Sequence, residues 1–192
     1  MPKILAFAGS ARKESYNKLL LAVAVQGARQ AGATVTEIDL ADFPMPLLNE
    51  DLEREHGMPE HAGKFKELLI AHDGLLIASP EYNSAFSPLL KNAIDWASRR
   101  ESDDEIGLIA YKGKTAAIMS AAAAGYGGLR GLVFLRMLLG NIGVTVLADQ
   151  ITVAHAPKAF NSDGSLVDEA KTQAVHALSA KLTSTVAKLT SV

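Results

Sequence analysis

Short apolar runs of strand length alternate with helical patterns along this chain of 192 residues. Continuous apolar runs are typical of parallel strands that are buried on both faces of a sheet. The alternation therefore predicts an α/β fold, with five parallel strands and right-handed crossovers, in one domain spanning residues 1–192. The strands are expected at 3–8, 34–39, 74–79, 114–120 and 144–153. The helices are expected at 16–31, 60–71, 88–97, 129–142 and, after a turn at 161–164, up to about residue 189.

Two segments give more detailed expectations. Residues 40–58 contain two prolines and an acidic run, so they are predicted to be a long surface connection. In the last helix, Ser165 and Asp168 are interpreted as a capping box. The stripe that this helix is expected to bury consists of residues that recur every four positions, namely Ala170, Ala174, Leu178, Leu182 and Val186.

Composition limits the possible functions. The net charge is -2 and the pI is about 6.2, which does not favour a nucleic-acid partner. Cysteine is absent, so the chain has no disulfide, thiol chemistry or cysteine metal site. No metal is expected, and the five histidines, which lack ligand spacing, are predicted to lie at the surface. Neither a membrane-spanning run nor a signal-peptide pattern is seen, so a cytoplasmic protein is expected.

The stretch 9–17, GSARKESYN, lies between the first strand and the first helix. Helix N-termini carry unpaired N–H groups and a partial positive charge, which together favour anions. Ser10, Ser15 and Asn17 add polar side chains, and Arg12 adds a planar cation suited to phosphate oxygens. The loop is therefore interpreted as a phosphate site, with a polar turn in which Ser15 merely caps the helix as the alternative.

The loops after the third and fourth strands complete the pattern. The segment 79–96, SPEYNSAFSPLLKNAIDW, offers backbone groups that could contact the edge of a flat heterocycle, with Tyr82 able to pack against it. The alternative is an ordinary β–α loop capped by Ser87. A glycine-rich loop follows at 121–128. All three loops are expected on one edge of the sheet, beyond the carboxyl ends of the strands.

Together these motifs resemble the NAD(P)H-dependent FMN reductase family, which includes quinone, azo-dye and chromate reductases. The patterns are G-S-x-R-x-x-S-x-N after the first strand and S-P-E-Y-N followed by L-K-N-A-I-D-W after the third. The resemblance covers residues 4 to about 153. It implies a flavodoxin-like three-layer sandwich with strand order 2-1-3-4-5, FMN as cofactor and NAD(P)H, with NADPH favoured, as electron donor.

The resemblance also implies roles for particular residues. Those matching the FMN phosphate ligands are Ser10, Arg12, Ser15 and Asn17. Those matching the border of the isoalloxazine and ribityl chain are Pro80, Glu81, Tyr82 and Asn83. Ser120 and Gly125 match the third loop, although alanines here follow the serine where many relatives carry an early glycine. Family members pair through the helices at 89–96 and 129–142, so a homodimer, or a homotetramer, is expected.

The implied reaction is ping-pong hydride transfer from NAD(P)H to FMN and then to a quinone, azo compound, metal oxyanion or free flavin. The flavin carries this chemistry, so no catalytic side chain is expected. Arg99 and Arg100 are candidates for contacting the nicotinamide nucleotide or a partner subunit. The alternative is a non-enzymatic FMN-binding electron carrier or redox-sensing module.

Overall fold

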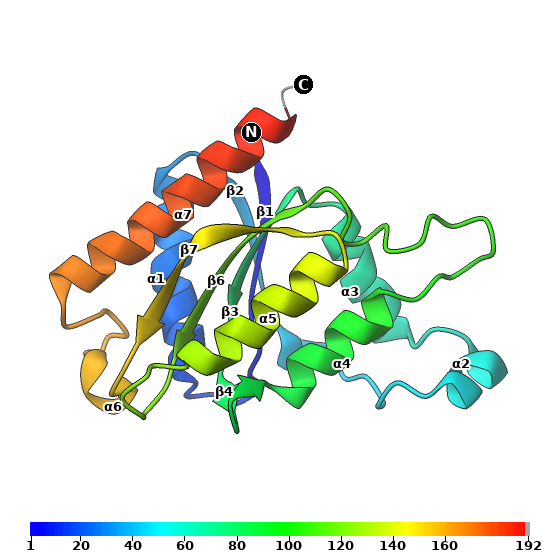
Figure 1. The fold of residues 1–192 in the computed structure, drawn as a ribbon, viewed down its shortest axis with the longest axis horizontal. Helices are drawn as coiled ribbons and strands as arrows, with labels where there is room; N and C mark the ends of the chain where they lie inside the picture. The colour runs from blue at the N-terminus through cyan, green and yellow to red at the C-terminus, as the bar shows by residue number, and fades with distance from the viewer. Residues whose placement is uncertain (191–192) are drawn as a thin grey trace.

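A computed structural model describes residues 1–190 and contains a five-stranded parallel sheet (Figure 1). Its strands are β1 (Lys3–Ala8), β2 (Thr34–Asp39), β3 (Gly74–Ala78), β6 (Thr115–Ala121) and β7 (Thr145–Val153). They are ordered β2-β1-β3-β6-β7, and all neighbouring pairs are parallel. This is the predicted flavodoxin-like order, with the switch in strand order between β1 and β3. The three central strands are almost wholly apolar and buried.

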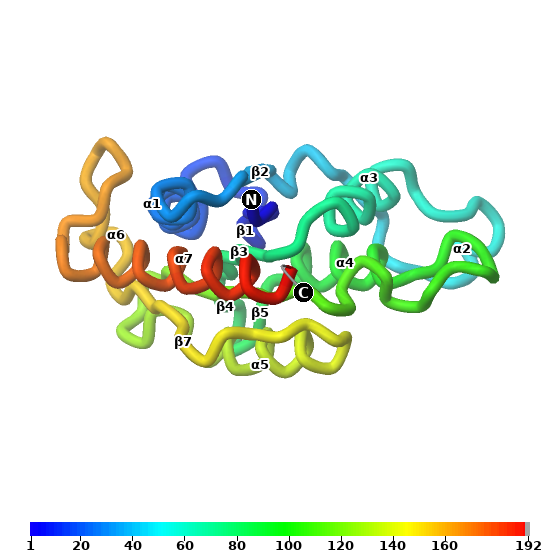
Figure 2. Tube along the Cα trace, turned by 90° about the horizontal axis from the view of Figure 1, so that it is seen from above, coloured from blue at the N-terminus to red at the C-terminus, as the bar shows by residue number. Residues whose placement is uncertain are grey.

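Helices cover both faces of this sheet (Figure 2). One face carries α1 (Tyr16–Gln30) and α7 (Glu169–Thr190), and the other carries α3 (Glu60–Ile70), α4 (Pro88–Ala97) and α5 (Leu129–Asn141). Each face has its own apolar core, one built around Leu20, Leu76 and Leu182 and the other around Phe65, Ile77 and Leu135. The result is the expected three-layer sandwich.

Four short elements were not predicted. They are the 3-10 helix η1 (Leu40–Asp42), helix α2 (Glu50–His56), the hairpin of β4 (Glu81–Tyr82) and β5 (Ala85–Phe86), and helix α6 (Ala156–Ala159). The acidic run forms α2 because Asn49 caps it, bonding the backbone N–H of Asp51 at 2.9 Å. None of the residues of α2 is buried, so no apolar pattern marks it in the sequence.

Three smaller expectations are corrected. Asp168 alone caps α7, because its Oδ1 accepts from the backbone N–H of Lys171, whereas Ser165 bonds to Asp163 in the preceding turn. The buried stripe of α7 begins at Val175, whereas Ala170 is exposed and Ala174 is only half-buried.

His72 is buried and not at the surface. Its two ring nitrogens lie 2.6 Å from the carbonyl oxygen of Leu68 and 2.7 Å from Oγ1 of Thr36, so both are paired. Because both nitrogens have hydrogen-bond partners within the protein, the imidazole can be buried without binding a ligand.

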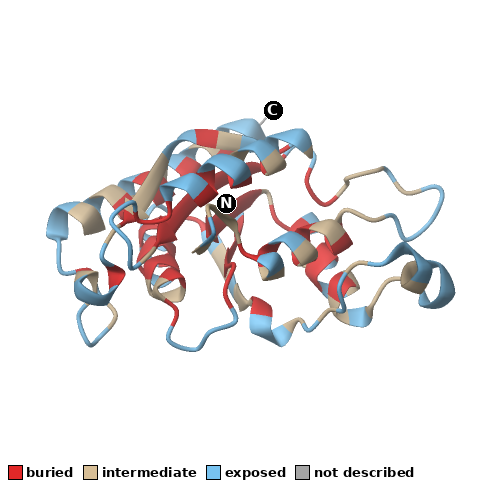
Figure 3. Ribbon diagram, turned by 60° about the horizontal axis from the view of Figure 1, so that its bottom comes forward, coloured by how far each residue is buried: buried red, intermediate tan, exposed pale blue. Residues whose placement is uncertain are grey.

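The loops after β1, β3 and β6 meet at the carboxyl edge of the sheet, with the β4–β5 hairpin beside them (Figure 1). Viewed toward this edge, the strands are buried and the connecting loops are largely exposed (Figure 3). Among residues 1–190, no helix has both the length and the apolar character needed to cross a membrane. The fold therefore brings the predicted loops together at one edge.

Candidate functional site

The loop after β1 leads into the open N-terminus of α1. Ser15 is the N-cap, and its Oγ accepts from the backbone N–H of Asn17 at 3.3 Å. Ser10 is buried, and its Oγ accepts from the backbone N–H of Arg12 at 3.3 Å. The capping interpretation of Ser15 is thus correct, and it is compatible with an anion site because both hydroxyl protons stay available as donors.

Arg12 presents the cation of this loop. Its residue is exposed, and its Cζ lies 5.2 Å from the ring centroid of Tyr16. Within residues 1–190 its guanidinium forms no hydrogen bond or ion pair. A free guanidinium beside a helix N-terminus can bind two phosphate oxygens at once.

Asn17 is buried and links this loop to the third one. Its Nδ2 donates to the carbonyl oxygen of Ala121, and its Oδ1 accepts from the backbone N–H of Ala121, both at 2.9 Å. One N–H of the amide therefore remains for a ligand. The main contact of Asn17 in this structure fixes the start of α1 to the end of β6.

The segment after β3 forms a tight hairpin. Asn83 and Ser84 have φ of 50° and 70°, which together are typical of the type I′ turn that joins two-residue hairpins. Tyr82 is 53 % exposed at its tip. Pro80 precedes the hairpin and packs near Gly9, where a Cβ would lie 3.3 Å from the Pro80 ring.

The side chain of Glu81 contacts helix α5, which could not be inferred from the sequence. Its Oε2 accepts from the backbone N–H of Gly131 at 3.0 Å, in the first turn of α5. The N-cap of that helix, Gly128, has no side chain to serve this purpose. Glu81 thus caps α5 from a distance in sequence and complements the dipole of that helix.

The third loop combines an unpaired hydroxyl with close backbone approach. Ser120 is fully buried, and its Oγ has no hydrogen-bond partner within the described part of the chain. Gly128, with φ of 88°, lies so close that a Cβ there would fall 1.8 Å from this Oγ. Gly127, with φ of 60°, approaches the backbone of Val153 and Ala154 in the same way.

Gly125, the glycine selected from the sequence, is exposed, and a Cβ there would lie in ordinary contact with the His155 ring, at 3.8 Å. The glycines that the backbone requires are therefore Gly127 and Gly128. One signal in the sequence could have identified them, because consecutive glycines immediately before a helix favour a positive φ.

The first two loops are bonded to each other. Ser87 caps α4 by accepting from the backbone N–H of Leu90 at 3.2 Å, and its Oγ donates to the carbonyl oxygen of Gly9 at 2.5 Å. Gly9 packs tightly, since a Cβ there would lie 3.1 Å from that of Leu90. Ser87 was expected only as a cap, but it also sets the distance between the loops.

Two residues at the end of the second motif, Asn92 and Trp96, form hydrogen bonds to the connection after β2. Asn92 Oδ1 accepts from the backbone N–H of Leu48, and its Nδ2 donates to the carbonyl oxygen of Pro46, both at 2.9 Å. Trp96 is buried and donates from Nε1 to the same oxygen at 2.7 Å. These residues of α4 therefore anchor the connection after β2, and sequence reasoning had assigned them no role.

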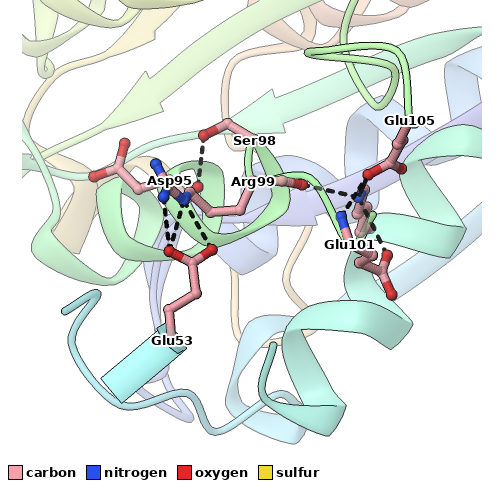
Figure 4. Close-up of polar contacts among 7 residues, drawn as sticks. Glu53, Asp95, Ser98, Arg99, Glu101 and Glu105 are labelled. Carbon is pink, nitrogen blue, oxygen red and sulfur yellow. Dashed lines mark hydrogen bonds and ion pairs between the residues drawn. The ribbon is translucent and has the colours of Figure 1, made fainter. Parts of the chain in front are cut away.

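Arg99 and Arg100 lie apart from the three loops, at the opposite end of α4 from Ser87. The Arg99 guanidinium donates from Nε to both carboxylate oxygens of Glu53 in α2, at 2.9 and 3.0 Å (Figure 4). It also forms an ion pair with Glu50. The hydrogen bond to Glu53 is the main reason that the pKa of Arg99 is raised. Arg100 is exposed, and its side chain lies against Gly107. Within this chain neither arginine joins the candidate site.

Taken together, the site offers what a phosphorylated, polar ligand requires. A free guanidinium and a helix N-terminus suit the phosphate, and the orphaned Ser120 hydroxyl is a buried polar group that a ligand would satisfy. Gly127 and Gly128 keep side chains out of the third loop, so a flat ligand can approach its backbone. The residues present thus fit FMN.

Comparison with known proteins agrees with this geometry. The family model for NADPH-dependent FMN reductase matches residues 2–158. An NAD(P)H-dependent FMN reductase of Pseudomonas aeruginosa is 38 % identical over 169 residues, covering 87 % of this chain and 85 % of that protein. An NADPH:quinone oxidoreductase of Arabidopsis thaliana is 34 % identical over 172 residues, covering 87 % and 83 %.

The structure of the flavoenzyme FerB of Paracoccus denitrificans, an NAD(P)H:(acceptor) oxidoreductase, superposes with a TM-score of 0.80. It shares 26 % sequence identity, and the match covers 98 % of each chain. Such a match over the full length supports the assignment from sequence. The chain thus belongs to the NADPH-dependent FMN reductase family and is an oxidoreductase that uses FMN with NAD(P)H as electron donor.

Proposed function

We propose that this enzyme reduces quinones with NAD(P)H by a ping-pong route, with FMN held at the carboxyl edge of the sheet. The observation that supports the site most directly is that Asn17, in the loop of the unpaired Arg12 guanidinium, is bonded to Ala121, the neighbour of Ser120 with its unpaired buried hydroxyl. Quinone is the preferred acceptor class because relatives from Arabidopsis thaliana and Solanum tuberosum are named quinone oxidoreductases.

The phosphate would be held by the loop after β1. Arg12 supplies charge, and the hydroxyls of Ser10 and Ser15 donate hydrogen bonds beside the first turn of α1. The spare N–H of Asn17 adds a fourth donor, while its bonds to Ala121 keep the loop in place.

The ring would be held by the other two loops. The backbone of the segment 80–83 would border its edge, the exposed Tyr82 would pack against it, and the unpaired hydroxyl of Ser120 would donate to one of its polar atoms. Gly125 leaves this loop open to the solvent side, where a nicotinamide or a quinone could enter. When bound, FMN supplies hydride acceptance from NAD(P)H and reduction of the second substrate, so no side-chain nucleophile is required.

The reaction can be tested in three steps with the purified chain. Titration with FMN should produce a yellow complex with a raised melting temperature, because a ligand that binds only the folded state stabilises it. Addition of NADPH without oxygen should bleach the flavin band. Steady-state turnover of NADPH with a benzoquinone should give parallel double-reciprocal lines.

Each step has an outcome that contradicts the proposal. A chain that neither becomes coloured nor gains thermal stability with FMN has no such site. Bleaching without turnover on quinones would favour the electron carrier, and intersecting lines would exclude the ping-pong order. Azo compounds, chromate and free FMN as second substrates in the same assay define the acceptor, and NADH in place of NADPH defines the donor.

We further propose that the active form is a homodimer paired through α4 and α5. The outer face of α5 exposes large apolar side chains, namely Tyr126 just before the helix, then Leu129, Val133, Phe134 and Met137. An apolar groove of about 420 Å³ runs between this face, α4 and the hairpin residue Phe86. A second copy of the chain is the occupant expected for a face of this kind in the family, and it would lie next to the hairpin that carries Tyr82.

A further inference from the structure

We propose that an aromatic stack formed by Tyr16 and Phe160 positions the guanidinium of Arg12 for the phosphate of FMN. This inference rests on the proposed function, because it concerns the same phosphate. It adds a positioning element that lies partly beyond residues 2–158, the range matched by the family model. Phe160 would thus be a contribution of the C-terminal part of this chain to the site.

The three side chains form a continuous column. The Cζ of Arg12 lies 5.2 Å from the Tyr16 ring centroid, which is within the range of a cation–π contact. The Tyr16 and Phe160 rings are stacked, with centroids 6.1 Å apart and planes inclined by 12°. Both rings are half-buried and pack against the core between the sheet and α1 and α7. Only Arg12, at the open end of the column, is exposed.

The backbone at each ring is held by secondary structure, namely α1 for Tyr16 and a β-bridge for Phe160. Tyr16 is the first residue of α1, next to the cap Ser15. Phe160 pairs as an isolated β-bridge with the buried Leu166, and the backbone N–H of Val167 donates to the carbonyl oxygen of Ala159 at 3.0 Å. The segment 154–168, between β7 and α7, therefore holds Phe160 against Tyr16 at the start of α1.

This column leaves the binding groups of Arg12 free. The contact with the Tyr16 ring occupies none of the N–H donors of the guanidinium with a hydrogen-bond acceptor, so these donors can still bind phosphate oxygens. Because no hydrogen bond or ion pair holds the Arg12 side chain within residues 1–190, the ring of Tyr16 is its main constraint. Limiting its rotamers before binding reduces the entropy that is lost when the phosphate arrives.

The test compares FMN with riboflavin, which lacks the phosphate. Dissociation constants are measured by flavin fluorescence for the wild type, Tyr16→Leu, Tyr16→Phe and Phe160→Leu, and for Tyr16→Leu in an Arg12→Ala background. Tyr16→Leu should weaken FMN binding about two- to fivefold, as expected for an exposed cation–π contact, and leave riboflavin binding unchanged. Tyr16→Phe should bind as the wild type, and Phe160→Leu should show a smaller loss confined to FMN.

The double mutant separates positioning from a general effect on the fold. If Tyr16 acts through Arg12, Tyr16→Leu should cause no further loss once Arg12 is alanine. Equal loss for FMN and riboflavin, or a full effect of Tyr16→Leu in the Arg12→Ala background, would overturn the inference. A wild type that binds riboflavin and FMN equally overturns the proposed phosphate site itself, and with it the role of the stack.

Discussion

Arg12 is the residue on which recognition of the phosphate depends, because it brings an unpaired charge to the loop after β1. Arg12→Ala is expected to weaken FMN binding by about 1.5–3 kcal/mol, the range for a hydrogen bond to a charged group. The matched control is Lys13→Ala, which removes the adjacent exposed cation and should have a much smaller effect. Isothermal titration with FMN measures both. An equal loss in the two variants would show that only overall charge matters and that Arg12 has no specific contact.

Asn17 illustrates a motif residue whose contact is mainly structural. The amide nitrogen and oxygen of Asn17 are both bonded to the backbone of Ala121 in a buried position. Asn17→Ala therefore leaves the N–H and the carbonyl oxygen of Ala121 without these partners. Asn17→Ala is expected to lower the free energy of unfolding by about 1–3 kcal/mol, as measured by urea denaturation without FMN. Arg12→Ala, at an exposed position, is the comparison and should stay within about 0.5 kcal/mol of the wild type. If Asn17→Ala is equally stable, its bonds to Ala121 do not hold the two loops together.

At the scale of elements, the sequence was informative wherever apolar residues follow a regular period. The strands and long helices were found because they bury whole faces or stripes, as in β3 and α4. The hairpin at Asn83–Ser84 was missed because each of its strands has two residues and its turn lacks the usual glycine. Helix α6, of four residues, is likewise too short for a periodic pattern.

The same distinction applies to the candidate site. Loops that follow buried strands could be located in advance, since parallel strands end at one edge of the sheet. Contacts between loops could not, because they depend on distances that only the folded backbone defines. The bond from Ser87 to Gly9, the cap that Glu81 provides for α5 and the orphaned hydroxyl of Ser120 all belong to this second kind.

The segment 98–114, between α4 and β6, is held by an ion pair between the buried Lys66 and the half-buried Glu105. Lys66 of α3 donates to Glu105 Oε2 at 2.6 Å and to the carbonyl oxygen of Arg99 at 2.8 Å, and so holds this segment to α3. Figure 4 labels the two acceptor residues, Glu105 and Arg99. The hydrogen bond from Lys66 is the main cause that lowers the pKa of Glu105 below its ordinary value of 4.5, with burial acting in the opposite direction. A carboxyl whose pKa is lower in the folded state stabilises the fold above that ordinary value and loses this contribution as the pH falls through the folded pKa.

Glu105→Gln is therefore expected to be less stable than the wild type near pH 7, by on the order of 1–2 kcal/mol. The difference should narrow below pH 4.5 as the wild-type carboxyl is protonated. Urea unfolding at pH 7, 5 and 3.5 measures this. Glu60→Gln serves as the control, because it removes an exposed pair with Lys64 and should change stability far less. A difference that stays constant down to pH 3.5 would mean that the charge of Glu105 is not what stabilises the segment 98–114.

At the scale of the whole molecule, the two layers of helices differ in what they leave exposed. In α5, Leu132, Leu135 and Leu139 are buried against the sheet, whereas Leu129, Val133 and Met137 recur every four residues on the outer face. The helix thus carries apolar residues on both sides, but this chain covers only one of them. An uncovered apolar face of this kind is typical of a surface that binds another protein.

Burial of a charge at such a surface opposes association, so Val133→Lys should convert the proposed dimer to a monomer. Val167→Lys is the matched control, because Val167 is 60 % exposed and Val133 57 %, yet Val167 lies just before α7 and away from this face. Sedimentation velocity at micromolar concentration should give a dimer for the wild type and for Val167→Lys. A wild type that remains monomeric at tens of micromolar would refute pairing through α5, and four chains reduced to two by Val133→Lys would indicate a tetramer with a second contact. Because α5 begins directly after the glycine loop at 127–128 and is capped by Glu81, loss of pairing should also weaken FMN binding.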